Sequence, residues 1–312
     1  MSKRYLITGG AGFIGSHLSH ALVARGDRVI ILDSLDSGNL SNIADLLNHE
    51  SVAFIKDTIV NGQGLLSLCS SVDGIFHLAA LVSVQRSIDD PRFNHQVNID
   101  GLFEVFEAAR IAKVPKIVLA SSAALYGNAY DPPHKESFSP VPLSPYAVGK
   151  LLSESYAAVY TDLYGVRSVC LRFFNVYGPK QDPSSPYSGV ISRFMDALSR
   201  NDYLTIFGDG EQTRDFVYVQ DVVQALLLAM EQNVSGVFNV GTGCSVSINK
   251  LARVVMQVAG KEVMIRHLDA RQGEVRHSCS DITKISNEMG YRPGYSLHEG
   301  ITETYKWWMK KA

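Results

Sequence analysis

The chain has 312 residues, of which 46% are hydrophobic and 19% are charged, an ordinary composition for a soluble globular protein. Its net charge of −2 gives no broad basic surface, so we expect no nucleic-acid partner. No apolar run approaches the ~18 residues of a membrane span, and no secretory signal is visible, so we expect a cytoplasmic protein without membrane contact. The cysteines are scattered without the spacing of metal ligands, which predicts reduced thiols and no metal site.

Short apolar runs alternate with helical patterns through the first half of the chain. The runs of strand length cover residues 5–8, 28–33, 52–55, 74–79, 116–120 and 168–173. The helical patterns cover residues 13–25, 98–112 and a long segment from about Ser144. Strands that alternate with helices predict an α/β fold with a doubly wound, Rossmann-like parallel sheet that is covered on both faces.

Beyond Asn175 the alternation loosens, and residues 178–186 are rich in turn formers. We therefore expect residues 1–175 to form the main domain and residues 176–312 a smaller C-terminal region. The apolar run over 236–241 is typical of a buried strand, and we expect it to return to the main sheet. The main domain would then also include a segment from the C-terminal region.

Three glycines, Gly9, Gly12 and Gly15, lie between the first predicted strand and the first predicted helix. Glycines allow a tight turn and a close backbone approach, and the helix N-terminus attracts a pyrophosphate. A glycine triplet alone is weak evidence, because a tight strand–helix turn needs glycine without any ligand. Asp33 ends the next strand, where a carboxylate accepts hydrogen bonds from ribose hydroxyls and repels a 2′-phosphate. No arginine directly follows Asp33, so the pattern favours NAD over NADP, although a surface aspartate closing a strand is the alternative.

Tyr146 and Lys150 stand four residues apart in a predicted helix, so they share one helical face. A fixed positive charge lowers the pKa of a phenol from its usual value near ~10, which would make Tyr146 a candidate general base at neutral pH. A hydroxyl partner is available in Ser121 and Ser122, at the end of a predicted strand where open sheets place their ligands. A serine pair that only caps the strand end is the alternative.

Together these motifs resemble the signature of the extended short-chain dehydrogenase/reductase family. The likeness runs through residues 172–179 and 214–219, and within the family the chain is most similar to the nucleotide-sugar 4-epimerases. It implies that Ser122 supplies the catalytic hydroxyl and acts with Tyr146 and Lys150. Ser121 is the alternative, because a shift of one residue in the alignment with the family would select it instead. Related 4,6-dehydratases carry an Asp-Glu pair directly after this serine. This chain has Ala123 and Ala124 there, which disfavours dehydration.

The resemblance also implies which residues contact NAD. It places Asp57 near the adenine, Leu78 and its two neighbours along the cofactor groove, and Asn98 in a supporting polar network. His77, beside this groove, is expected to be structural. The expected cofactor contacts are Gly9, Gly12, Phe13, Ile14, Gly15, Asp33, Asp57, Leu78, Ala79, Ala80, Asn98, Tyr146 and Lys150.

For a UDP-sugar substrate, the resemblance implies contacts from both parts of the chain. Arg214 and Arg271 would bind the pyrophosphate through bidentate guanidinium groups, although an isolated arginine is usually a solvated surface residue. Glu274 would lie near the nucleotide ribose. The expected substrate contacts are Ser83, Ser122, Tyr146, Asn175, Arg214, Arg271, Glu274 and Ser278, and Ser87 is a further candidate near the hexose.

Ser278 bears on the choice of sugar. By the resemblance it stands where a tyrosine excludes an N-acetyl group and a small residue admits it. We therefore expect a 4-epimerase that interconverts UDP-GlcNAc and UDP-GalNAc, with UDP-Glc and UDP-Gal as a further pair, through a 4-keto intermediate and transient reduction of NAD. A homodimer through the helices that begin near Asn98 and Ser144 is also implied.

Two other interpretations stay open. The chain could be another nucleotide-sugar enzyme of the same family, such as a uronate epimerase, a decarboxylase or a net reductase. It could also be a nucleotide-binding protein that has lost its chemistry. An intact set of Ser122, Tyr146 and Lys150 argues against the second, because a binding module does not need these three groups.

Overall fold

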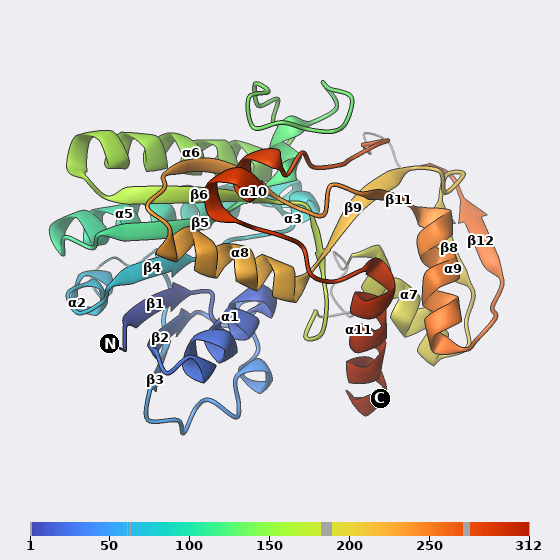
Figure 1. Ribbon diagram of the computed structural model, residues 1–312, viewed down its shortest axis with the longest axis horizontal. Helices are drawn as coiled ribbons and strands as arrows, with labels where there is room; N and C mark the ends of the chain where they lie inside the picture. Colours follow the sequence, from blue (N-terminus) through green and yellow to red (C-terminus); the bar gives the residue numbers. More distant parts are fainter. Residues whose placement is uncertain (1, 61, 63, 182–188, 271–274, 312) are drawn as a thin grey trace.

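The computed structural model describes residues 2–60, 62, 64–181, 189–270 and 275–311 (Figure 1). Seven parallel strands form the main sheet in the order β10-β6-β5-β4-β1-β2-β3. The predicted α/β fold with a parallel, Rossmann-like sheet is confirmed. The bounds of these strands are β1 (Arg4–Thr8), β2 (Arg28–Asp33), β3 (Val52–Lys56), β4 (Gly74–His77), β5 (Lys116–Ser122), β6 (Arg167–Phe173) and β10 (Gly236–Val240).

The order of the strands reverses between β1 and β4. The chain runs outward from β1 through β2 to β3, and then returns to build β4, β5 and β6 on the other side. Open α/β sheets bind ligands at such a reversal, in the crevice outside the carboxyl ends of the strands. The helices are α1 (Phe13–Ala24), α2 (Leu65–Cys69), α3 (Val84–Asp89), α4 (Pro91–His95), α5 (Gly101–Ile111), α6 (Pro145–Tyr164), α7 (Val190–Ser199), α8 (Val219–Glu231), α9 (Ile248–Ala259), α10 (Thr283–Met289) and α11 (Leu297–Lys311).

Two hydrophobic layers cover the faces of the main sheet. Ile7 and Ile31 belong to the layer that includes buried residues of α1 and α8, whereas Leu6 and Ile30 belong to the layer that includes α5 and α6. Neighbouring residues of a strand point to opposite faces, so continuously apolar strands supply both layers at once. Figure 1 shows α1 and α8 on one side of the sheet and α5 and α6 on the other.

Several predicted elements have slightly different limits in the structure, and two of these differences lie beside the crevice. The run 74–79 is a strand only up to His77, and the bond from the Leu78 N–H to the Thr8 carbonyl, of 3.0 Å, is the last ladder bond between β4 and β1. The helix predicted from residue 98 is preceded by a π-helical turn over Gln96–Asp100, and the regular α-helix begins at Gly101.

The C-terminal half builds smaller sheets and then rejoins the large one. Its short strands form a three-stranded sheet in the order β11-β9-β7 and a two-stranded sheet of β12 and β8, and its own hydrophobic core includes buried residues of α7, α9 and α11. The run expected to return to the main sheet is β10, which pairs in parallel with β6. The bounds are β7 (Asn175–Tyr177), β8 (Leu204–Phe207), β9 (Thr213–Tyr218), β11 (Ser245–Ser247) and β12 (Ile265–Leu268).

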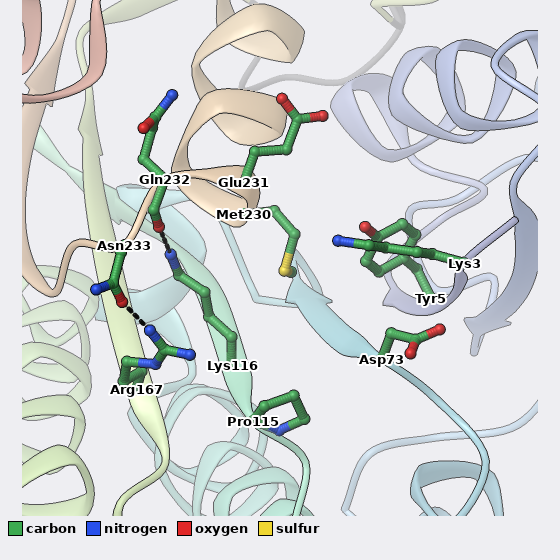
Figure 2. A pocket seen from close by; sticks show the side chains of 10 residues that line it. All are labelled: Lys3, Tyr5, Asp73, Pro115, Lys116, Arg167, Met230, Glu231, Gln232 and Asn233. Atoms are coloured by element: carbon green, nitrogen blue, oxygen red, sulfur yellow. Dashed lines mark hydrogen bonds between the residues drawn. The ribbon is translucent and has the colours of Figure 1, made fainter. Parts of the chain in front are cut away.

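A cavity of about 370 Å³ opens at the amino ends of the strands, away from the crevice (Figure 2). Lys116 lies in its wall, and its ammonium donates to the carbonyl of Gln232, just past the end of α8. Burial, and the nearby Arg167, lower the pKa of Lys116 to about 8. A cation at a helix C-terminus satisfies a free carbonyl and suits the helix dipole, so this lysine caps α8.

Among the described residues, no helix combines the length and the apolar character needed to cross a lipid bilayer.

Candidate active site

The glycine turn between β1 and α1 packs against the chain that follows β4. Gly9 has a φ of +74°, and a Cβ atom there would lie 2.7 Å from the backbone nitrogen of Ala79. A Cβ atom on Gly15 would lie 2.2 Å from the carbonyl oxygen of Gly9. Gly12 is the N-cap of α1 and supplies no side-chain bond to the first turn, which Phe13 and Ile14 begin. The backbone N–H groups of this turn therefore remain available to an anion such as a pyrophosphate.

Asp33 stands beside this turn at the end of β2. Its buried carboxylate accepts the backbone N–H of Ala11 at 2.9 Å and that of Leu35 at 2.8 Å. Each oxygen keeps a lone pair that can accept a ribose hydroxyl. Asp57, after β3, donates its backbone N–H to the Asp33 carbonyl at 3.2 Å, so both acids lie at the same end of the groove. The glycine turn and these acids fit a dinucleotide with free ribose hydroxyls.

Asn98 holds the other wall of the groove. Its side-chain oxygen accepts the Leu81 N–H at 2.8 Å, and its amide donates to the Leu81 carbonyl at 3.0 Å and to Asn94 at 2.8 Å. These bonds fix the segment directly after Leu78, Ala79 and Ala80. Asn98 is thus a support for the groove.

His77 ends β4 next to this wall. Its Nδ1 lies 2.8 Å from the Thr8 hydroxyl, and burial, with a smaller effect of Lys150, lowers its pKa to about 3. The imidazole is therefore neutral at physiological pH. Such a group links β1 to β4, in keeping with the structural role expected for it.

Tyr146 and Lys150 lie in the first two turns of α6, which begins at the N-cap Ser144. Both side chains are buried, at 8% and 6% exposure. The Ser122 side chain, at the end of β5, lies close enough to the Tyr146 phenol to lower its pKa. The structure therefore brings these three predicted residues together at the carboxyl edge of the sheet.

Burial shifts the pKa values of both Lys150 and Tyr146, and the shift of Tyr146 differs in direction from the sequence prediction. The Lys150 ammonium donates to the Ala120 carbonyl at 2.7 Å and lies 5.8 Å from the centre of the Tyr146 ring. Burial lowers the pKa of Lys150 to about 8. Burial also raises the pKa of Tyr146, and the nearby Ser122 side chain opposes this only in part. In the chain by itself the pKa of Tyr146 is therefore raised instead of lowered as expected, because desolvation is the largest influence on the phenol.

The two neighbouring serines have different partners. Ser121 is buried and donates its hydroxyl to Glu154 at 2.6 Å, whereas Ser122 contacts the Tyr146 phenol. Glu154 also forms two hydrogen bonds with Arg172, of 2.9 and 2.8 Å. Glu154 is not among the predicted site residues, although it stands four residues after Lys150 and so shares its helical face.

The two predicted serines that follow β4, Ser83 and Ser87, form hydrogen bonds with backbone groups near them. Ser83 is the N-cap of α3 and accepts the Arg86 N–H at 3.0 Å. Ser87 is fully buried, donates to the Val84 carbonyl at 2.6 Å and accepts the Tyr146 N–H at 3.1 Å. Ser87 therefore anchors the start of α6 and is closed off from a sugar.

The remaining predicted substrate residues lie in the C-terminal half, apart from the three catalytic candidates. Asn175 is exposed at the start of β7, and Arg214 is half-buried on β9. Ser278 is buried, and its backbone N–H donates to the Thr213 carbonyl at 3.1 Å, which sets it beside Arg214. Arg271 and Glu274 lie outside the described residues.

The segment that contains Ser278 meets the loop that follows β5. His134 in this loop donates its backbone N–H to the Cys279 carbonyl at 2.8 Å. The His134 ring stacks on Tyr126, with 4.8 Å between the ring centres, only four residues after Ser122. The C-terminal half therefore closes against the same edge of the sheet that presents Ser122.

Comparisons with known proteins agree with this geometry. A family model described as GDP-mannose 4,6 dehydratase matches residues 6–304. The UDP-glucose 4-epimerase of Mycolicibacterium smegmatis is 40% identical over 99% of both chains.

Two solved structures share the fold over nearly their whole length. The UDP-N-acetylglucosamine 4-epimerase of Methanobrevibacter ruminantium, in complex with UDP-N-acetylmuramic acid, has a TM-score of 0.97 at 38% identity, and the match covers 100% of this chain and 99% of that one. The UDP-glucose 4-epimerase of Thermus thermophilus, in complex with NAD, has a TM-score of 0.91 at 34% identity, covering 99% and 100%. The chain therefore belongs to the extended short-chain dehydrogenase/reductase family of nucleotide-sugar epimerases and dehydratases.

Proposed function

We propose that this protein is an NAD-dependent UDP-sugar 4-epimerase that interconverts UDP-N-acetylglucosamine and UDP-N-acetylgalactosamine. The observation that carries the proposal is the placement of Ser122 at the end of β5, where its side chain acts on the buried Tyr146 phenol, with Lys150 one turn further along α6. Ala123 and Ala124 supply no acid pair for the elimination of water. The 4-epimerase relatives, including one named for the N-acetylated sugar and one solved with NAD, support the same assignment.

In this mechanism, Tyr146 removes the proton from the sugar 4-hydroxyl, and Ser122 orients that hydroxyl and relays the proton. NAD, when bound at the glycine turn and Asp33, supplies a reversible acceptor for the C4 hydride. Lys150 supplies the positive charge that favours the phenolate once the site is filled. The 4-keto sugar turns over within the site and regains hydride and proton on the opposite face, so no net oxidation occurs.

The direct test is to incubate the NAD-loaded protein with UDP-N-acetylglucosamine, without any reductant, and to follow the formation of UDP-N-acetylgalactosamine. Tyr146→Phe should abolish turnover while NAD stays bound. Tyr156→Phe, on the same helix, is the matched control and should retain activity. Release of CO2 from a uronate substrate, or accumulation of free NADH, would instead identify a decarboxylase or a net reductase.

We propose that Ser278 admits the N-acetyl group. Its small side chain is buried beside β9, where a tyrosine would fill the space next to the sugar. Ser278→Tyr should remove activity on the acetylated pair and spare UDP-glucose and UDP-galactose. Ser278→Ala keeps the residue small and should leave the ratio of the two activities unchanged. An equal loss on both pairs in the tyrosine variant would contradict this role.

Arg214 is the proposed cation for the pyrophosphate of the substrate, together with Arg271. The Arg214 guanidinium donates to the backbone carbonyl of Thr213 at 2.9 Å, which holds its base against β9. Asn175 and Glu274 complete the proposed contacts to the nucleotide and the sugar diphosphate. Arg214→Lys keeps the charge and loses the bidentate fork, so KM for UDP-sugars should rise more than kcat falls.

A homodimer through α5 and α6 is also proposed. These two adjacent helices expose large apolar side chains, and Leu163 is 70% exposed. The exposed set on the two helices is Phe103, Ile111, Val148, Val159, Leu163 and Tyr164. Such a surface on neighbouring helices is typical of a protein–protein interface. Leu163→Asp should halve the mass in sedimentation, whereas Met264→Asp, at a position that is 82% exposed on the other half of the molecule, should not.

A further inference from the structure

A buried ion pair lies directly behind the proposed catalytic residues. The side chains of Glu154 and Arg172 are 7% and 3% exposed, and two hydrogen bonds of 2.9 and 2.8 Å join them. The Glu154 oxygen Oε1 also accepts the Ser121 hydroxyl at 2.6 Å. Burying two charges has a large desolvation cost, and a well-packed apolar pair would often be as stable. The pair therefore calls for a function other than stability.

The position of Glu154 connects it to both parts of the site. Tyr146, Lys150 and Glu154 follow one another at intervals of four residues, so they form a single stripe along α6. On the other side, Ser121 directly precedes Ser122 and is the register partner of Arg172 in the pairing of β5 with β6. The Glu154 carboxylate thus lies on the same helical face as Lys150 and is bonded to the residue that precedes Ser122.

We propose that Glu154 is a positioning residue of the active site: its carboxylate keeps Lys150 protonated, and its bond to Ser121 fixes the strand end that presents Ser122. This inference rests on the proposed function, because it assigns Glu154 a part in the same reaction. Arg172 holds the carboxylate in place with its two parallel hydrogen bonds.

The other groups around Lys150 do not supply a negative charge. The Ala120 carbonyl accepts its hydrogen bond from β5. Burial raises the pKa of the Cys170 thiol on β6 and lowers that of His77 on β4 to about 3, so both groups are neutral at pH 7. Tyr146 is protonated at rest for the same reason. Burial lowers the pKa of Lys150 to about 8, and Cys170 and Glu154 oppose this in part. Because the Cys170 thiol is neutral at pH 7, the carboxylate of Glu154 is the opposing group that carries a negative charge there.

The test is the pH dependence of kcat in the NAD-loaded Glu154→Gln variant. Loss of the neighbouring carboxylate should lower the pKa of Lys150 by roughly one unit, because a nearby opposite charge favours the charged form of the lysine. The alkaline limb of the profile should move towards lower pH by the same amount. An alkaline limb that stays in place would overturn the proposal.

Glu107 offers a control with the same set of bonds. It accepts two hydrogen bonds from Arg110, of 2.9 and 2.7 Å, and one from the hydroxyl of Tyr160 on α6, of 2.6 Å. Glu107→Gln therefore removes a carboxylate with equivalent partners, one of them on the same helix. It should leave the alkaline limb of kcat unchanged. An equal shift in this variant would mean that Glu154 acts only through general damage to the helix.

The two parts of the role can be separated. Ser121→Ala keeps the charge of Glu154 and removes the bond to the strand end, so kcat should fall several-fold while the alkaline limb stays in place. Glu154→Asp keeps the charge on a shorter side chain and should restore most of the alkaline limb. If Ser121→Ala moved the limb, or if Glu154→Asp failed to restore it, the charge would not be the cause.

Breaking a buried pair can destabilise the fold, so the double variant Glu154→Gln/Arg172→Met is also needed. This double variant leaves no unpaired guanidinium, so it should be more stable than Glu154→Gln. The alkaline limb of its kcat profile should still lie at lower pH than in the parent. A readout independent of turnover is the titration of the Lys150 ammonium itself, followed by NMR of protein with isotope-labelled lysine and assigned with Lys150→Met. In Glu154→Gln this ammonium should lose its proton at lower pH than in the parent. An unchanged titration would refute the proposal even if the protein acted on no UDP-sugar.

Discussion

Replacement of Gly9 by alanine tests how the dinucleotide groove is built. Gly9 has a φ of +74°, and its Cβ atom would lie 2.7 Å from the Ala79 nitrogen and 2.9 Å from the Ala79 Cα atom. A non-glycine residue in the left-handed region costs about 1–2 kcal/mol. Forced contact with a packed backbone adds about 1–3 kcal/mol, because the segment after β4 must shift. We therefore expect Gly9→Ala to lower the free energy of unfolding by about 2–5 kcal/mol.

Gly26 supplies the matched control for this substitution. It also has a positive φ, of +82°, but a Cβ atom there would meet nothing within 4 Å. Gly26→Ala therefore carries the backbone strain alone and should cost about 1–2 kcal/mol. The difference between the two variants measures the close approach of the glycine turn to Ala79.

Urea denaturation and calorimetric titration with NAD provide the measurements for both variants. Gly9→Ala should be the less stable protein and should bind NAD more weakly, because the shifted segment forms one wall of the groove. Gly26→Ala should bind NAD like the parent. If both variants lost the same stability and kept the same affinity, the argument from the Gly9–Ala79 contact would be refuted.

Three further substitutions probe the frame of the site. The pKa of buried His77 is about 3 in the folded chain against 6.5 unfolded, so the unfolded state binds the extra proton below pH 6.5. Stability should fall by about 2 kcal/mol between pH 6.5 and about pH 5, and His77→Asn should remove this part of the urea-midpoint slope. Asn98→Ala removes the hydrogen-bond partners of the Leu81 N–H and carbonyl, so it should lower the free energy of unfolding by about 2–4 kcal/mol. An unchanged urea midpoint would contradict this. Ser144→Ala removes the N-cap of α6 and should cost about 1 kcal/mol in thermal unfolding, whereas Ser144→Asp should not.

The parts of the molecule that depend on local sequence are predictable from the chain. The apolar runs and helical periods give the α/β class, because each strand must supply both faces of a covered sheet. Gly9, Gly12 and Gly15 with Asp33 predict the dinucleotide end, since turn geometry and the strand end are set by neighbouring residues. The limits of elements are less predictable: the apolar run 74–79 is a strand only up to His77, because pairing with β1 ends at Thr8.

By itself, the sequence determined which groups could do the chemistry: a tyrosine and a lysine on one helical face, and a serine pair at a strand end. The tertiary structure decided how they are used. Pairing of β5 with β6 and packing of α6 direct Ser121 to Glu154 and leave Ser122 beside Tyr146. Burial then sets the direction of each pKa shift. Such outcomes depend on contacts between residues that are far apart in sequence and on the exclusion of water, and neither is encoded in local spacing.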